Sequence, residues 1–251
     1  MTNEPVNAGI TGKQLQTAEF DPRLREEVDA VFWVFDEVRR GRRLPVIEAD
    51  AVAHSLYVSM RLDANGVVPQ LPLHDMNEYN AVHGINVALL AMGAAESMNL
   101  EEQAVRAVGL AGLLADIGMV RVPVDMLAKA EQLTDEERAI VMRHPIDGAV
   151  IIAEADAPLD LAAVVAYEHH IKPDGTGYPT VTYPRSSHRI AGLISVCDTY
   201  HALRSPRPFR DSWPIDIVFS FLQQRSGYDF DPEMVAIVSN LMRPAAATQG
   251  S

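Results

Sequence analysis

HHIKPDGTGYP, residues 169–179, joins two adjacent histidines to a turn rich in glycine and proline. Consecutive side chains on an ideal helix point about 100° apart, so His169 and His170 serve one site only where a helix ends or where two ions lie side by side. Asp174-Gly175 and Gly177-Tyr178-Pro179 provide such a break, because these residue types interrupt helices. Without the histidines, the same stretch would indicate only an ordinary loop.

The rest of the chain predicts helices and no strands. Apolar residues recur at helical spacing in a series of segments: 28–38, 48–62, 82–99, 101–115, 158–169, 189–203, 214–225 and 232–242. The first of these apolar faces consists of Val28, Val31, Phe32, Phe35 and Val38. Thr134 and Glu137 form a capping-box pattern that opens a further helix, expected to carry His144 close to Pro145. No segment alternates apolar and polar residues between hairpin turns, so the predicted fold is all-α.

Composition and charge limit the classes of function. The chain has 251 residues, of which 48% are hydrophobic and 22% charged, as is typical of a globular protein. No apolar run approaches the roughly 20 residues that span a bilayer, and the first residues lack a secretory pattern, so we expect a cytoplasmic protein without a membrane segment. The net charge of −13 argues against binding to a nucleic-acid polymer or to an anionic membrane. A single cysteine, Cys197, is expected to be a buried apolar residue.

One segment departs from this acidic average. Residues 169–210 contain six basic and two acidic residues, an excess of four positive charges. A locally basic segment in an acidic protein fits a small phosphorylated ligand better than a polymer.

Four histidines and two aspartates form a candidate metal-binding set. Each histidine alone is weak support, because a single histidine in a helix is more often a surface or hydrogen-bonded core residue. Together they lie at or within predicted helices, where inward-facing side chains can converge on a metal. Imidazole and carboxylate without thiolate suit Fe, Mn, Ni, Co or Zn, and two ions bridged by a carboxylate would polarise a phosphodiester and activate water. The set consists of His83, Asp116, His144, His169, His170 and Asp198.

The motif at 169–179 resembles the signature of the HD-GYP family of metal-dependent phosphodiesterases. Further segments resemble the family's motifs in the same order, over residues 76–243: HGINVALLA from His83, LLADIGMVRVPVDMLAK around Asp116, LTDEERAIVMRHPIDGA around His144, ISVCDTYHAL around Asp198, then RPFR and FDPEMV. The resemblance implies an HD-domain-like helical bundle, with a small helical region before it. It also implies the six metal ligands above, with Asp116 as the catalytic carboxylate.

The same resemblance implies a ligand and a cofactor. The ligand is a cyclic dinucleotide, cyclic di-GMP, and the cofactor is a divalent transition metal, Fe or Mn, as one or two ions. Charge-assisted hydrogen bonds from arginine suit the phosphates of such a ligand. The residues expected to contact it are Tyr178, Arg204, Arg207 and Arg210.

The chain departs from the family pattern at several positions that bear on catalysis. Ala115 replaces the histidine of the HD dyad, and a methyl group cannot coordinate a metal. Met119 replaces the lysine that would lie near the scissile phosphate, and Ile171 replaces a glutamate expected to support an imidazole. His201 stands in place of a second aspartate, where we expect a solvent-facing or loop-bonding side chain rather than a new ligand. A mononuclear centre with impaired catalysis follows as an expectation.

Three hypotheses for function remain open. The first is a divergent domain that binds metal and cyclic di-GMP but hydrolyses it poorly or not at all, and the second is an active phosphodiesterase. The third is a catalytically dead protein-interaction module. In each case residues 1–72 are predicted to form a regulatory or dimerising helical region and residues 73–251 the HD-GYP-like domain. A homodimer and a signalling protein partner are further expectations.

Overall fold

The computed structural model describes residues 24–62, 71, 78–127, 129, 131–182, 186–206 and 211–242. Within them the chain forms helices joined by short loops and no named strand, with only two isolated bridges, Ile171–Gly177 and Ser226–Phe230. The predicted all-α fold is confirmed. The elements are α1 (Arg25–Arg39), α2 (Val46–Leu62), α3 (Tyr79–Ser97), α4 (Glu102–Leu114), η3 (Ile117–Arg121), α5 (Val124–Leu127), α6 (Asp135–Val141), α7 (His144–Ala153), α8 (Asp160–Glu168), α9 (Arg189–Arg204), α10 (Ile215–Arg225) and α11 (Pro232–Met242).

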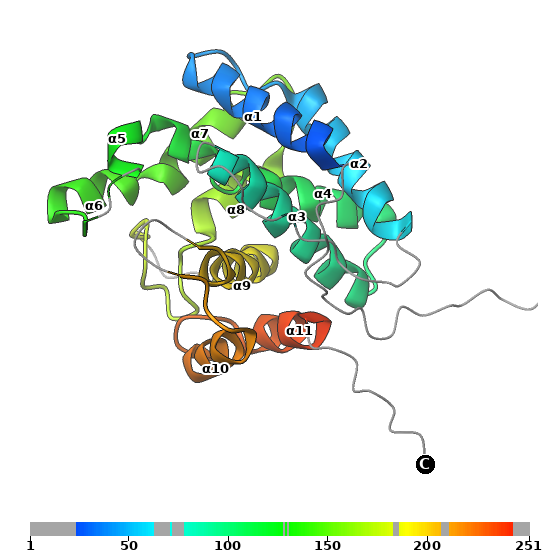
Figure 1. Cartoon of the computed structure of the whole chain (residues 1–251), viewed down its shortest axis with the longest axis vertical. Coiled ribbons are helices and arrows are strands. Elements are labelled where there is room, and N and C mark those ends of the chain that lie inside the picture. The colour runs from blue at the N-terminus through cyan, green and yellow to red at the C-terminus, as the bar shows by residue number, and fades with distance from the viewer. Residues whose placement is uncertain are drawn as a thin grey trace, which may run out of the picture.

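Helix α3 forms the centre of the bundle. Every residue from Ala81 to Ala95 is buried, and a helix that is apolar on all sides must be surrounded by other elements. In Figure 1, α1 and α2 cover α3 and α4 on one side, and α9 to α11 lie on the other. His83 and Asn86 are buried polar residues on this central helix, so they require polar partners inside the protein.

The N-terminal helices share one apolar core with the rest of the bundle. The predicted face of α1 is buried at Val28, Val31, Phe35 and Val38, whereas Phe32 is 42% exposed, so its assignment to that face was wrong. The apolar side chains of α1 and α2 pack in the same cluster as those of α3 and α4. The expected division at residue 72 lies outside the described residues and stays a prediction.

The helix predicted to run from Thr134 past His144 is two helices. The capping box is present, since the Thr134 hydroxyl accepts from the Glu137 amide and the Glu137 carboxylate accepts from the Thr134 amide. Helix α6 ends at Val141, and α7 begins at His144 with a proline in its first turn. Proline interrupts a helix because it has no amide hydrogen to donate and its ring clashes with the carbonyl four residues earlier. For Pro145 that carbonyl belongs to Val141, and it accepts instead from Nδ1 of His144 at 2.8 Å.

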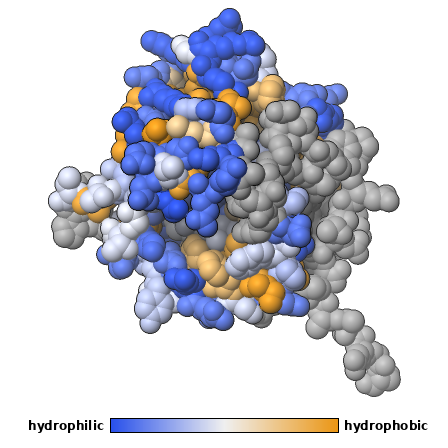
Figure 2. Space-filling view, turned by 60° about the vertical axis from the view of Figure 1, so that its left-hand side comes forward, coloured by the Kyte–Doolittle hydropathy of each residue, from blue (hydrophilic) through white to orange (hydrophobic). Residues whose placement is uncertain are grey.

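One segment, Glu102–Arg121, has the length and apolar composition of a membrane span. Its apolar window is 67% buried within the protein, as expected for a core helix of a folded domain. The face of the molecule in Figure 2 is mainly hydrophilic, with apolar side chains in small groups between polar ones.

Gly118 allows η3 to pack directly on the start of α7, and its replacement by alanine is expected to destabilise the protein. A Cβ at Gly118 would lie 2.0 Å from the His144 carbonyl oxygen and 2.6 Å from the Gly148 amide nitrogen, both rigid backbone atoms. Such overpacking costs about 1–3 kcal/mol or more, measurable by urea denaturation.

Gly192 in α9 provides the control for this substitution. A Cβ there would have its nearest contact at 3.7 Å, so Gly192→Ala is expected to stabilise the protein by about 0.5–1 kcal/mol through the lower backbone entropy of the unfolded chain. Equal effects of the two substitutions would contradict the close approach of η3 to α7.

Candidate metal centre

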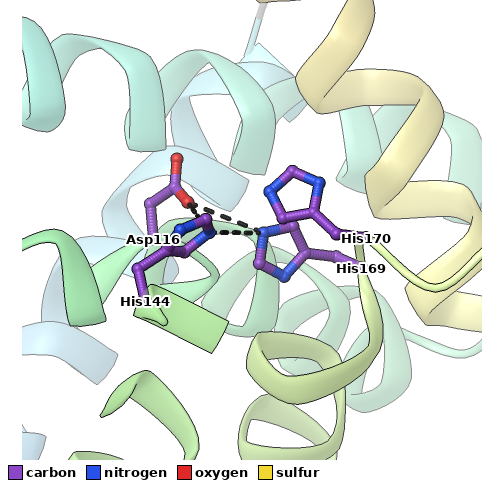
Figure 3. Close-up of side chains that lie close together, drawn as sticks. All are labelled: Asp116, His144, His169 and His170. Carbon is purple, nitrogen blue, oxygen red and sulfur yellow. Dashed lines mark hydrogen bonds and ion pairs between the residues drawn. The ribbon is translucent and has the colours of Figure 1, made fainter. Parts of the chain in front are cut away.

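Four side chains from three helix ends form the first group, here called the histidine cluster (Figure 3). Asp116 lies between α4 and η3, His144 is the first residue of α7, His169 caps the end of α8, and His170 comes next in the chain. One ligand atom from each residue lies within 4.8 Å of those of the other three. Several helix ends meet here. Residues at or next to these ends therefore bring their side chains to one point.

Asp116 is the centre of the histidine cluster. Its Oδ1 lies 3.2 Å from Nε2 of His144 and 3.6 Å from Nε2 of His169. These two Nε2 atoms are themselves 3.3 Å apart, as the dashed lines in Figure 3 indicate. The ring of His170 lies against that of His169 in a tilted arrangement, with 4.0 Å between centroids and 46° between the ring planes.

The donor atoms of this cluster fit a metal ion. Nδ1 of His144 faces the Val141 carbonyl, and Nδ1 of His169 faces the Val165 and Ala166 carbonyls. A carbonyl only accepts hydrogen bonds, so both Nδ1 atoms carry a hydrogen and the Nε2 lone pairs point at each other and at Asp116. Such convergence of lone pairs requires a cation between them, either a proton or a metal. Backbone acceptors that fix the tautomer of a ligand histidine are typical of metal sites.

The second oxygen of Asp116 takes part in another group, here called the aspartate cluster: His83, Asp116 and Asp198. Nε2 of His83 lies 3.5 Å from Oδ2 of Asp116 and 2.8 Å from Oδ1 of Asp198. Asp116 therefore faces both clusters, one with each oxygen, as a carboxylate that bridges two ions does. Ala115, next to it in the chain, is buried and adds no donor.

The electrostatics of the clusters keep their carboxylates ionised. Burial opposes ionisation of Asp116, but hydrogen bonds from His144 and His169 hold its pKa well below the usual value. Burial likewise opposes ionisation of Asp198, and the hydrogen bond from His83 nevertheless lowers its pKa. Burial and the neighbouring His169 lower the pKa of His170 to about 3, so its ring is neutral and available as a ligand near neutral pH.

Metal binding is expected to strengthen as the pH rises through the range just above 6.5. Burial lowers the pKa of His144, but the hydrogen bond and charge of Asp116 outweigh it and raise this pKa above 6.5. A metal at Nε2 must displace that proton, which becomes easier as the pH rises. Calorimetric titration with Mn²⁺ from about pH 6 to about pH 8, in buffers of different ionisation enthalpy, measures both affinity and proton release. Flat affinity without proton release would contradict this prediction.

A buried chain of polar residues lies behind His83, and the sequence did not reveal it. Nδ1 of His201 lies 2.8 Å from Nδ1 of His83, and Nε2 of His201 lies 2.8 Å from the Asn86 amide nitrogen and 3.1 Å from the Ser205 hydroxyl. The solvent-facing position expected for His201 is wrong, because this residue is only 6% exposed. Asn86 lies one turn after His83, and this i, i+3 spacing of polar residues on an apolar helix was the available signal.

The partners of Asn86 determine the protonation of this chain. Its oxygen accepts from the Leu71 amide, so its nitrogen is the donor toward the Leu71 carbonyl and toward Nε2 of His201. His201 therefore carries its hydrogen on Nδ1 and donates to Nδ1 of His83, whose Nε2–H donates to Asp198. A metal at Nε2 of His83 requires both histidines to change tautomer, with Ser205 as the acceptor available to His201.

The residues expected to contact a ligand are only partly described. Tyr178 stacks on His170, with ring centroids 4.5 Å apart, and thus lies at the edge of the histidine cluster. Arg204 donates to the Trp213 carbonyl at 2.7 Å. Arg207 and Arg210 lie outside the described residues. The ligand-binding role of all four expected contact residues stays a prediction.

The chain forms an all-α domain in which several helix ends bring histidine and aspartate side chains together. Helical domains of this class can hold a metal ion between their helices. The model of the HD domain family matches residues 70–234, so the chain belongs to this family. This match confirms the HD-type family that the sequence motifs predicted, while the HD-GYP signature at residues 169–179 is a resemblance carried by the sequence itself.

Several known proteins resemble the chain. A cyclic di-GMP phosphodiesterase of Pseudomonas aeruginosa is 32% identical over 205 residues, which are 82% of this chain and 49% of that protein. A cyclic di-GMP phosphodiesterase response regulator of Xanthomonas campestris is 32% identical over 142 residues, 56% of this chain and 38% of that protein. A solved structure described as an HDG"Y"P protein from Bdellovibrio bacteriovorus shares the fold, with a TM-score of 0.69 and 15% identity over 86% of this chain and 68% of that chain. The chain spans about half of the length, or less, of these two curated relatives.

Proposed function

We propose that this protein binds a divalent transition metal and cyclic di-GMP in the cytoplasm and acts as a sensor or interaction module with impaired or absent phosphodiesterase activity. The observation that carries this proposal is that the two clusters differ in their number of donor residues. The histidine cluster has four donor residues, whereas the aspartate cluster has three, with a methyl group at Ala115. The histidine cluster would therefore ligate an ion well, and the aspartate cluster would not.

The polar chain behind His83 weakens the aspartate cluster further. In the arrangement seen, Nε2 of His83 carries a hydrogen that it donates to Asp198. Its removal for metal binding leaves His201 with its hydrogen on Nε2, which can be donated to the Ser205 hydroxyl but no longer accepts from the amide nitrogen of Asn86. Loss of the Asn86 hydrogen bond favours the metal-free state of the aspartate cluster.

The residues of the chain have separate tasks in this proposal. Asp116, His144, His169 and His170 would hold the ion, which we expect to be Fe or Mn from the nitrogen and oxygen donors. When bound, the ion supplies Lewis acidity toward a phosphodiester oxygen and activates water. Tyr178 lies against His170 and presents an aromatic surface beside it, while the basic residues Arg204, Arg207 and Arg210 offer charge to the phosphates.

An active phosphodiesterase is the second candidate function. It is favoured by the bridging position of Asp116, whose two oxygens face the two clusters. The names of the relatives from Pseudomonas and Xanthomonas support the same substrate class.

The two candidates are separated by one experiment on anaerobically prepared protein loaded with Fe(II) or Mn(II) and analysed for metal content. Equilibrium dialysis with cyclic di-GMP measures binding, and chromatography of the same samples measures linear dinucleotide and GMP. Saturable binding without steady turnover supports the proposal. Turnover that is lost in Asp116→Asn and kept in Asp125→Asn would show the active enzyme instead. Absence of saturable binding by folded, metal-loaded protein would leave the protein-interaction module.

A further inference from the structure

A cavity of about 390 Å³ lies between the end of α1 and the elements η3 and α7. Four arginines line it: Arg39, Arg42, Arg43 and Arg121. Among the described lining residues only Glu154 is acidic, although the whole chain has a net charge of −13. No residue of either metal cluster lines it, so this cavity is separate from the candidate metal centre.

The floor of the cavity is apolar. Val38, Leu44, Val120 and Ile151 line it and are all buried. Arginines around an apolar floor suit an organic anion, because guanidinium groups bind phosphate in bidentate fashion while the floor covers the organic part. A cavity of this size is within the range of small-molecule sites.

The arginines are available for exchange with a ligand. Arg42 pairs with Glu37, Arg43 with Asp156, and Arg121 with Asp147, and the arginine side chains of these pairs are 48–70% exposed. The Arg43–Asp156 pair is exposed on both sides and contributes little to stability, so a phosphate can replace this carboxylate at low cost. The carboxylates of Glu37 and Asp147 are only 7% and 13% exposed, but they also pair with Arg40 and Arg143 and so keep a partner when Arg42 or Arg121 turns to a ligand. Arg39 forms no ion pair within the part of the chain that the structure describes.

The cavity is built on the same elements as the histidine cluster. Val120 and Arg121 belong to η3, which begins directly after Asp116, and Ile151 belongs to α7, which begins with His144. Gly118 keeps these two elements in backbone contact, as its Cβ position shows. A ligand that draws α1 toward η3 and α7 therefore acts on two members of the histidine cluster.

We propose that this cavity binds a small phosphorylated organic molecule that regulates metal binding at the histidine cluster. Binding itself is independent of the proposed function, whereas the regulatory step rests on metal binding there. The two parts are therefore tested separately, first on metal-free protein and then with Mn²⁺.

The first test uses phenyl phosphate and inorganic phosphate as probes on metal-free protein, followed by amide NMR shifts. Phenyl phosphate is expected to bind about tenfold more tightly than inorganic phosphate, because its ring covers the apolar floor. The largest shifts are expected near Gly41 and Arg121. Absence of binding, or shifts confined to the signature loop at residues 171–179, would overturn the proposal.

Substitutions of lining residues test where phenyl phosphate binds. One of them is expected to raise its affinity rather than to lower it. Arg39→Gln combined with Arg121→Gln is expected to weaken phenyl phosphate binding by about tenfold or more. Glu154→Gln removes the acidic side chain and is expected to tighten binding several-fold, an effect that misfolding cannot produce. Arg225→Gln on α10, on the opposite side of the molecule from α1 in Figure 1, is the matched control and should change nothing. Unchanged affinity in the Arg39/Arg121 and Glu154 variants would contradict the proposed site.

The second test measures Mn²⁺ affinity by calorimetry with and without saturating phenyl phosphate. Coupling between two sites is reciprocal, so we expect a change of about fivefold or more in Mn²⁺ affinity and the same factor in phenyl phosphate affinity when Mn²⁺ is present. Binding of both ligands without mutual effect would refute the regulatory role.

Discussion

Replacing Asp116 by asparagine is expected to abolish metal binding at both clusters. One oxygen of this carboxylate faces His144 and the other faces His83, so a single substitution removes a charged donor from each group. Loss of a residue that only supports a ligand costs about 10–100-fold in metal affinity, and loss of a direct, bridging ligand should exceed that range. Calorimetric titration with Mn²⁺, together with metal analysis after anaerobic loading with Fe(II), measures this effect.

The control for this variant is Asp125→Asn. Asp125 is exposed on α5, and its substitution removes one negative charge without touching either cluster. Mn²⁺ affinity should then equal that of the unchanged protein. If Asp116→Asn retained full affinity with an intact fold, the two clusters would not be the metal centre.

The sequence indicated which side chains lie close together, but not which hydrogen bonds fix each of them in place. Six residues far apart in the chain, from His83 to Asp198, could be grouped because their types suit one chemistry and their order resembles a known family. Their assignment as ligands stays a prediction, although the structure brings all six into two adjoining clusters. The break between α6 and α7 follows from Pro145, because proline removes an amide donor and clashes with the carbonyl four residues earlier.

Contacts across the bundle could not be anticipated in the same way. His201 and His83 are separated by 118 positions, and only the packing of α9 against α3 places their rings together. A histidine near a helix end gives no sign of whether it faces solvent or the interior. The arginine-lined cavity likewise is formed by residues of α1, the following loop, η3 and α7. These residues lie in separate segments of the sequence, and no single segment indicates that their positive charges gather around one cavity.

Replacing Ala115 by histidine is expected to strengthen metal binding at the aspartate cluster. That cluster has His83, Asp116 and Asp198 as donors, and Ala115 occupies the position of the dyad histidine in the resemblance to the HD-GYP family. A fourth donor next to Asp116 should raise affinity for the second ion by about 100-fold or more, given that changes outside the direct ligands already amount to 10–100-fold. Mn²⁺ titration should change from one tight site to two.

Because Ala115 is buried, its replacement by a larger residue lowers the stability of the protein. The control variant must therefore have a side chain of similar bulk. The residue is only 4% exposed, so a larger side chain is expected to destabilise the protein by about 1–3 kcal/mol without metal. Ala115→Phe adds similar bulk without a donor, and it should therefore lose stability without gaining Mn²⁺ affinity. Thermal unfolding with and without Mn²⁺ separates the two effects, because only the histidine variant should recover stability when the metal binds. If both variants bound Mn²⁺ as the unchanged protein does, the missing dyad histidine would not be what limits the Mn²⁺ affinity of the aspartate cluster. The tautomers of His83 and His201 would then remain as the cause.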